Sequence, residues 1–248
     1  RATGLQMAGG GRYALAMNAN LFAHMAAAFD IDREAPALVD AKDSGPNFGD
    51  LDRLSARFAS ALRRRGIGRG DRVIVQVEKS IEAVALYLAC LRTGAIFVPL
   101  NTAYTPSEVD HFVEDAEPRL VVLASDMAGP NASFLSDALA SEPDEGVVHC
   151  SADDIASIIY TSGTTGRSKG AMLSHGNLLS NAQTLIDIWG LTRNDVLIHA
   201  LPIFHVHGLF VDSHGDLLNG RRMIWFSRFE PAAVIVERSS RLTARPVP

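Results

Sequence analysis

The sequence is poor in cysteine, carries little net charge and contains no long apolar run. Its two cysteines, Cys90 and Cys150, lie far apart and lack metal-type spacing, so the sequence predicts no disulfide framework. A reducing, cytoplasmic location is therefore expected. The net charge of −5 argues against nucleic acid as a main partner. No apolar run approaches the ~20 residues of a membrane-spanning helix, so no membrane span is expected.

Two familiar nucleotide-binding motifs are also missing. The Walker loop needs Gly-x-x-x-x-Gly-Lys-Ser/Thr and the dinucleotide fingerprint needs Gly-x-Gly-x-x-Gly, and neither spacing occurs. The chain instead has Tyr160 to Gly170, with the sequence YTSGTTGRSKG. Glycines let backbone N–H groups approach an anion, hydroxyls donate to phosphate oxygens, and Lys169 supplies a mobile positive charge. This stretch predicts a loop that wraps a polyphosphate, with a solvated polar hairpin between two strands as the alternative.

Short apolar runs alternate with helical patterns along most of the chain. Apolar residues make up 47% of the sequence, which is ample for a packed core. Nearly continuous apolar strands indicate a mainly parallel sheet with helices on both faces, so the expected fold class is layered α/β. Thr105 and Glu108 have the spacing of a capping box with Pro106 between them, which predicts a helix start. Strands are expected at 72–77, 95–100, 120–124, 155–162, 170–173 and 195–201, and other helices at 50–66, 80–92 and 177–189.

Two polar stretches interrupt this pattern. Arg63, Arg64 and Arg65 close the first of these helices, either as an anion-binding patch or as a solvated last turn that complements the helix dipole. Residues 129–154 are acidic and punctuated by proline, and they predict a surface excursion that returns the chain to the sheet.

Four of the eight histidines lie between His199 and His214. On a strand, His205 and His207 would share one face, an arrangement that zinc sites use. Pro202 and Gly208 flank the pair and favour a turn instead, and no third ligand stands at a recognisable position. The adjacent residues 212–214 (DSH) raise Ser/His/Asp hydrolysis as a rival, but sequence neighbours rarely form a triad and no Gly-x-Ser-x-Gly elbow occurs.

The string at 160–170 closely resembles the phosphate-binding signature of the acyl-adenylate-forming superfamily, which contains acyl-CoA synthetases, luciferases and peptide-synthetase adenylation domains. The segment 201–208 (LPIFHVHG) is similar to the one that follows this loop in acyl-CoA synthetases. Residues 91–101 resemble the family's helix–strand signature before the acyl-binding half. Four further stretches together resemble the malonyl-CoA synthetase branch in particular, namely 101–105, 115–118, 166–175 and 195–202. The resemblance implies the first part of an adenylating-enzyme N-terminal domain.

The same resemblance implies an activity and a set of site residues. Family members adenylate a carboxylic acid with ATP and Mg²⁺, release pyrophosphate, and pass the acyl group to the thiol of coenzyme A. Malonate is the acid that the resemblance favours, and other short acids come next. Lys169 and His205 take catalytic roles, with His205 beside the acyl carboxylate, and the hydroxyl of Thr161 reaches Mg²⁺. The residues implied to hold the phosphates are Thr161, Ser162, Gly163, Thr164, Thr165, Gly166, Arg167, Ser168 and Lys169.

Complete family members are much longer, which sets the expected domain organisation. Residues 1–16 are expected to be a leader or expression remnant, 17–237 a partial AMP-binding domain and 238–248 a divergent tail, without the C-terminal lid domain. The parent activity is carboxylate–CoA ligation, and the chain as written is expected to be a truncated ligase. The alternative is a non-catalytic remnant that binds nucleotide weakly or not at all. The residue pattern makes no prediction of an oligomeric state.

Overall fold

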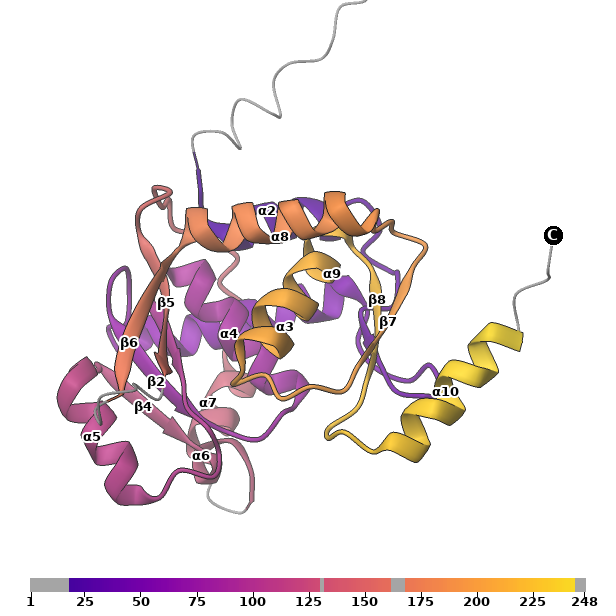
Figure 1. Ribbon diagram of the computed structural model, residues 1–248. Coiled ribbons are helices and arrows are strands. Elements are labelled where there is room, and N and C mark those ends of the chain that lie inside the picture. Colours follow the sequence, from indigo (N-terminus) through magenta and orange to yellow (C-terminus); the bar gives the residue numbers. More distant parts are fainter. Residues whose placement is uncertain (1–17, 130–131, 162–167, 244–248) are drawn as a thin grey trace, which may run out of the picture.

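The computed structural model describes residues 18–129, 132–161 and 168–243. Most of the predicted phosphate loop, 162–167, lies outside the described residues. The strands form a five-stranded sheet of order β4-β2-β3-β5-β6 and a three-stranded sheet of order β1-β8-β7 (Figure 1). Their bounds are β1 Leu38–Val39, β2 Arg72–Gln76, β3 Ile96–Pro99, β4 Leu120–Leu123, β5 Ile155–Thr161, β6 Lys169–Ser174, β7 Val196–His199 and β8 Arg222–Trp225.

The larger sheet is parallel from β4 to β5, and only β6 runs antiparallel at its edge. Its side chains alternate between two cores, as a pleated strand requires. Val73 and Val75 of β2 point into the main apolar cluster, whereas Ile74 between them belongs to a smaller one. The predicted mainly parallel α/β sheet with both faces covered is confirmed.

Helices cover the two faces of this sheet unequally. On one face lie α3 and α4, and α4 is buried along nearly its whole length, as its apolar sequence predicts. On the other face, α5 is the helix that packs against the sheet within the described part of the chain, and the predicted capping box between Thr105 and Glu108 starts it. The bounds of the helices are α2 Leu21–Phe29, α3 Phe48–Arg64, α4 Ile81–Thr93, α5 Pro106–Ala116, α6 Ala124–Met127, α7 Ser133–Ala140, α8 His175–Trp189, α9 His214–Asn219 and α10 Pro231–Thr243, with a π-helix η1 at His207–Ser213.

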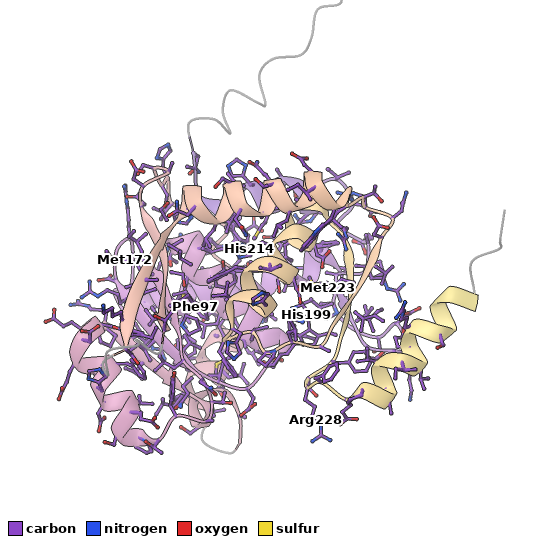
Figure 2. The ribbon with its side chains drawn as sticks, viewed as in Figure 1. Phe97, Met172, His199, His214, Met223 and Arg228 are labelled. Atoms are coloured by element: carbon purple, nitrogen blue, oxygen red, sulfur yellow. The ribbon has the colours of Figure 1, made fainter. Side chains whose placement is uncertain are left out.

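The smaller sheet packs onto the same main cluster as the larger one. Leu38 of β1, Met223 of β8 and Leu217 of α9 are fully buried in it, together with residues of α2. In Figure 1, α8 and α2 run along one side of the molecule and α10 projects from the opposite end. Figure 2 shows Phe97 and Met223 inside this body and Met172 on the outer edge strand, where 66% of the side chain is exposed.

Two expectations about the polar stretches need correction. Residues 129–154 are more than a surface excursion, because they contain α7, whose Phe134 is buried beside Phe58 of α3. The arginine run is neither a free anion patch nor merely a solvated turn. Arg64 and Arg65 both pair with Asp137 of α7, and Arg63 pairs with Asp144. The arginines therefore fasten α7 and the segment after it to the end of α3.

None of the helices that the structure describes combines the length and the apolar character needed to cross a bilayer.

Candidate functional site

A cavity of about 550 Å³ opens where the carboxyl ends of β3 and β5 meet the segment that leads into η1. The carboxyl ends of parallel strands are the usual place for a ligand in an α/β sheet. Residues from the three segments share its wall. They are Pro99, Leu100, Asn101 and Tyr104 after β3, Ile159, Tyr160 and Thr161 of β5, and Phe204, His205, Val206 and His207. Thr161 and His205, distant in sequence, thus line one cavity.

The predicted phosphate loop leaves the sheet beside this cavity. Thr161 ends β5 and pairs in register with Lys169, the first residue of β6, so residues 162–168 connect two antiparallel strands. The Thr161 hydroxyl lies 3.5 Å from the Lys169 carbonyl oxygen, and both side chains are exposed. Ser168 is half-buried. The six predicted contacts from Ser162 to Arg167 lie outside the described residues.

The wall of the cavity is supported from behind by α5. The Phe112 ring lies 5.1 Å from that of Tyr104 and 4.7 Å from that of Tyr160. The Tyr160 hydroxyl donates to Asp115, also on α5, over 2.6 Å. Burial, together with this carboxylate, raises the pKa of Tyr160 above its ordinary value, so its hydroxyl stays protonated. Both tyrosine rings are therefore held in place by Phe112 as parts of the cavity wall.

His205 and His207 lie in a turn and at the start of η1, not on a strand. The predicted turn is therefore present, and the shared strand face that a zinc site would use is not. Among the residues that the structure describes, no group of three His, Cys, Asp or Glu side chains is placed to hold a metal ion. His205 is exposed, and its ring lies 4.8 Å from that of Phe204. A π-helix is rare and often marks a functional site.

The hydrolase alternative fails on geometry. Ser213 is buried and contacts His199 over 3.0 Å, while its hydroxyl donates to the Gly208 carbonyl over 2.8 Å. His214 points the other way, into the core, where its Nε2 lies 2.7 Å from the hydroxyl of Tyr87. The adjacent residues at 212–214 therefore form no catalytic triad.

A charged group lies buried behind the histidine segment. Lys79, between β2 and α4, is 9% exposed, and its ammonium lies 2.7 Å from Nδ1 of His199 and 2.9 Å from the His199 carbonyl oxygen. Burial lowers the pKa of Lys79 to about 7 and, with the charge of Lys79, that of His199 to about 4. Sequence reasoning missed this pair because the two residues lie in separate segments and no local motif joins them.

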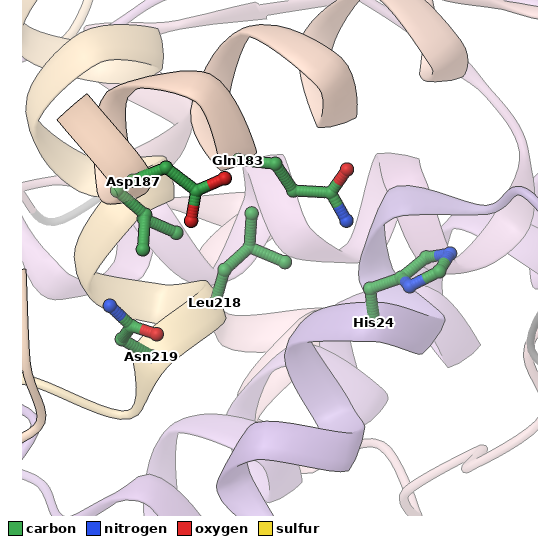
Figure 3. Close-up of a pocket in the computed structure, with 6 residues that line it drawn as sticks. His24, Gln183, Asp187, Leu218 and Asn219 are labelled. Atoms are coloured by element: carbon green, nitrogen blue, oxygen red, sulfur yellow. The ribbon is translucent and has the colours of Figure 1, made fainter. Parts of the chain in front are cut away.

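A second hollow, of about 420 Å³, lies between α2, α8 and α9 (Figure 3). His24, Gln183, Asp187 and Asn219 surround an apolar floor that includes Leu218. No residue singled out from the sequence lines it, so the cavity beside Thr161 remains the candidate site.

Comparison with known proteins identifies the family. The model of the family described as AMP-binding enzyme matches residues 26–243, which is most of the chain. The chain belongs to the AMP-binding enzyme family. Among solved structures, ATP-bound MatB from Rhodopseudomonas palustris has the same fold, with a TM-score of 0.83 and 41% sequence identity. The alignment covers 93% of this chain and 52% of that one.

Curated relatives of this AMP-binding enzyme are CoA ligases by name. Feruloyl-CoA synthase from Amycolatopsis sp. is 33% identical over 199 residues, which cover 76% of this chain and 40% of the relative. 4-Coumarate–CoA ligase 1 from Oryza sativa subsp. japonica is 32% identical over 248 residues, which cover 86% of this chain and 44% of the relative. The chain thus spans about half the length of MatB and less than half of these relatives.

Proposed function

We propose that this chain forms the triphosphate- and carboxylate-binding part of an ATP-dependent carboxylate–CoA ligase. In the reaction, a carboxylic acid and ATP give an acyl adenylate and pyrophosphate. The thiol of coenzyme A then takes the acyl group and AMP leaves. The observation that carries the proposal is the single cavity lined by both Thr161 and His205 in a chain of the AMP-binding family.

Each side chain has a role that follows from its chemistry. The carboxylate oxygen attacks the α-phosphorus, so a new O–P bond forms while the bond to pyrophosphate breaks. An imidazole N–H of His205 donates to the carboxylate and orients it. Orientation contributes more to the rate than proton transfer here, because a carboxylate is already deprotonated. Lys169 and the N–H and hydroxyl groups of residues 161–168 hold the β- and γ-phosphates and stabilise charge on the leaving pyrophosphate.

The Thr161 hydroxyl fits a magnesium ion as a single protein ligand. Mg²⁺ takes hard oxygen ligands, keeps several waters, and is bound mainly through substrate phosphates with one or two protein oxygens. Thr161 offers such an oxygen at the cavity wall, where the phosphate loop begins. A bound ion there neutralises phosphate charge.

Malonate is the acid that we propose. The stretches that resemble malonyl-CoA synthetases, such as 166–175 and 195–202, support it. An aromatic acid is the second candidate, because relatives are named for feruloyl and coumarate substrates. Parallel assays of acyl-CoA formation with malonate, ferulate and 4-coumarate, each with ATP, Mg²⁺ and coenzyme A, separate the two. Preference for either aromatic acid over malonate would overturn the malonate proposal.

Binding of Mg·ATP to the chain tests the phosphate role, measured by titration calorimetry. Lys169→Ala is expected to raise the Kd about 10- to 100-fold, because a lost charge-assisted hydrogen bond costs about 1.5–3 kcal/mol. Lys42→Ala removes an exposed lysine in the turn after β1 and is the matched control, with no change expected. An unchanged Kd for Lys169→Ala refutes the lysine assignment. A folded chain that binds no Mg·ATP at all supports the non-catalytic alternative.

A further inference from the structure

The imidazole of His199 connects the two ends of the segment 200–208, which carries His205. His199 ends β7, and its Nε2 lies 2.8 Å from the carbonyl oxygen of Gly208, at the far end of the segment. The same nitrogen lies 3.0 Å from the Ser213 hydroxyl, which itself donates to the Gly208 carbonyl. His199 is fully buried, so these hydrogen bonds are shielded from water. One side chain therefore joins the two ends of the segment 200–208.

Lys79 sets the orientation of this imidazole. An ammonium group only donates hydrogen bonds, so Nδ1 of His199 must be the acceptor in its 2.7 Å contact with Lys79. A neutral imidazole carries its one proton on the other nitrogen, and Nε2–H then donates to the Gly208 carbonyl. The Trp225 ring lies 4.5 Å from the imidazole and 4.1 Å from the ammonium, which limits their movement. Figure 2 shows His199 inside the body of the molecule.

A second, independent observation shows how tightly the segment is closed. A Cβ atom placed on Gly208 would lie 2.2 Å from the carbonyl oxygen of Pro202. The backbone on one side of the segment thus rests directly against the backbone on the other side. Between these points the chain presents Phe204 and His205 to the cavity wall.

We propose that His199 is a positioning residue: its imidazole, in the Nε2–H tautomer that Lys79 and the Gly208 carbonyl both require, holds the two ends of the segment 200–208 together and thereby fixes His205 at the cavity. We call this pair of contacts, from His199 to the two ends of the segment, the clasp. That His205 so fixed orients a carboxylic acid rests on the proposed function, whereas the existence of the clasp does not. Lys79 acts through His199, without contact to the cavity wall.

Histidine side-chain NMR on the purified chain tests the tautomer. In protein labelled with ¹⁵N at both imidazole nitrogens, at pH 6, His199 is expected to show a protonated Nε2 and an unprotonated Nδ1. Lys79→Met removes the donor to Nδ1 and is expected to shift the Nδ1 signal, while the Gly208 carbonyl keeps the proton on Nε2. Lys42→Met is the matched control and leaves the His199 signals unchanged. A wild-type His199 with its proton on Nδ1 overturns the proposal.

Amide hydrogen exchange tests the clasp with a matched pair of substitutions. His199→Gln keeps an N–H donor near the position of Nε2, whereas His199→Leu keeps a similar volume without any donor. We expect exchange in residues 203–209 to accelerate about three- to tenfold in His199→Leu, the range for one lost hydrogen bond, and to stay near wild type in His199→Gln. A role in packing alone predicts equal behaviour of the two variants, and that result overturns the clasp.

These readouts also separate the clasp from the proposed ligase function. Neither experiment contains nucleotide or acid, so the clasp stands or fails without them. A confirmed clasp in a chain that binds no Mg·ATP refutes the proposed function alone. If Lys79→Met does not fold, as judged by circular dichroism, the His199→Gln and His199→Leu pair decides the question.

Discussion

His214 makes the stability of this chain depend on pH in a way that can be calculated. Its side chain is fully buried, stacked on Tyr87 with Nε2 2.7 Å from the tyrosine hydroxyl, and close to Phe210. Burial lowers the pKa of His214 to about 3, against about 6.5 in an unfolded chain. Because the folded pKa is the lower one, the unfolded state binds a proton that the folded state does not between these two values. His214 therefore contributes stability that is fully present above pH 6.5 and is lost as the pH falls towards 3.

The magnitude follows from the linkage between protons and folding. One proton taken up on unfolding changes the unfolding free energy by about 1.4 kcal/mol per pH unit. Between pH 6.5 and 5.0, His214 alone accounts for a loss of about 2 kcal/mol. His175 and His199, whose pKa values burial lowers to about 4, add losses of the same sign. Asp216 opposes them, because burial raises its pKa to about 8.

Urea denaturation of two variants isolates the contribution of His214. His214→Gln removes the titrating group and keeps a hydrogen-bond partner for Tyr87, so other groups cancel in the difference between variant and wild type. From pH 6.5 to 5.0 the variant is expected to lose about 2 kcal/mol less unfolding free energy than wild type. His149→Gln, at an exposed histidine, is the control and should match wild type. Equal losses in His214→Gln and wild type would refute the reasoning.

Three further predictions follow from single contacts. Gly208→Ala forces a Cβ against the Pro202 carbonyl and should cost about 1–3 kcal/mol of unfolding free energy, seen as a lower urea midpoint. At pH 9, above the raised pKa of Asp216, Arg221→Met leaves the buried carboxylate of Asp216, 2.8 Å away, without its partner and should cost about 3–5 kcal/mol by the same measurement. A cost below about 1 kcal/mol, the ceiling for surface pairs, would contradict this. In pyrophosphate-release assays, His205→Ala should slow adenylation far more than a matched His207→Ala substitution, and equal effects would count against the acyl role of His205.

Much of the fold was predictable because local signals agree with the tertiary structure. The apolar runs at β2 and β3, the buried sequence of α4 and the capping box at Thr105 each indicated their elements directly. The helix α7 was missed because its sequence is short, and its place depends on Asp137 pairing with arginines far along the chain. Helix α2 was missed as well, since Leu21 to Phe29 is apolar on most sides and shows no amphipathic stripe.

The candidate site likewise has parts that the sequence could predict and parts that it could not. The string at 160–170 and the segment at 201–208 were visible in the sequence as motifs, and the structure brings Thr161 and His205 to one cavity. Sequence spacing could not predict that meeting, because it depends on how β3, β5 and the segment after β7 are arranged. The contact between Lys79 and His199 could not be predicted either, since Lys79 follows β2, His199 ends β7 and no local motif connects them.

The small separate cluster around α5 has a consequence for how such an enzyme changes its substrate. Phe112 supports two tyrosines of the cavity wall, yet it packs with Ile74 and Val98 in a cluster distinct from the main core. Effects of substitutions at distant, independent sites add, so the cost of a change in α5 should sum with the cost of a change far away in the main core without further coupling. If the proposed function holds, substitutions in α5 can reshape the cavity wall at a cost that does not compound with changes in the main core, which makes α5 a natural place to select for a new acid.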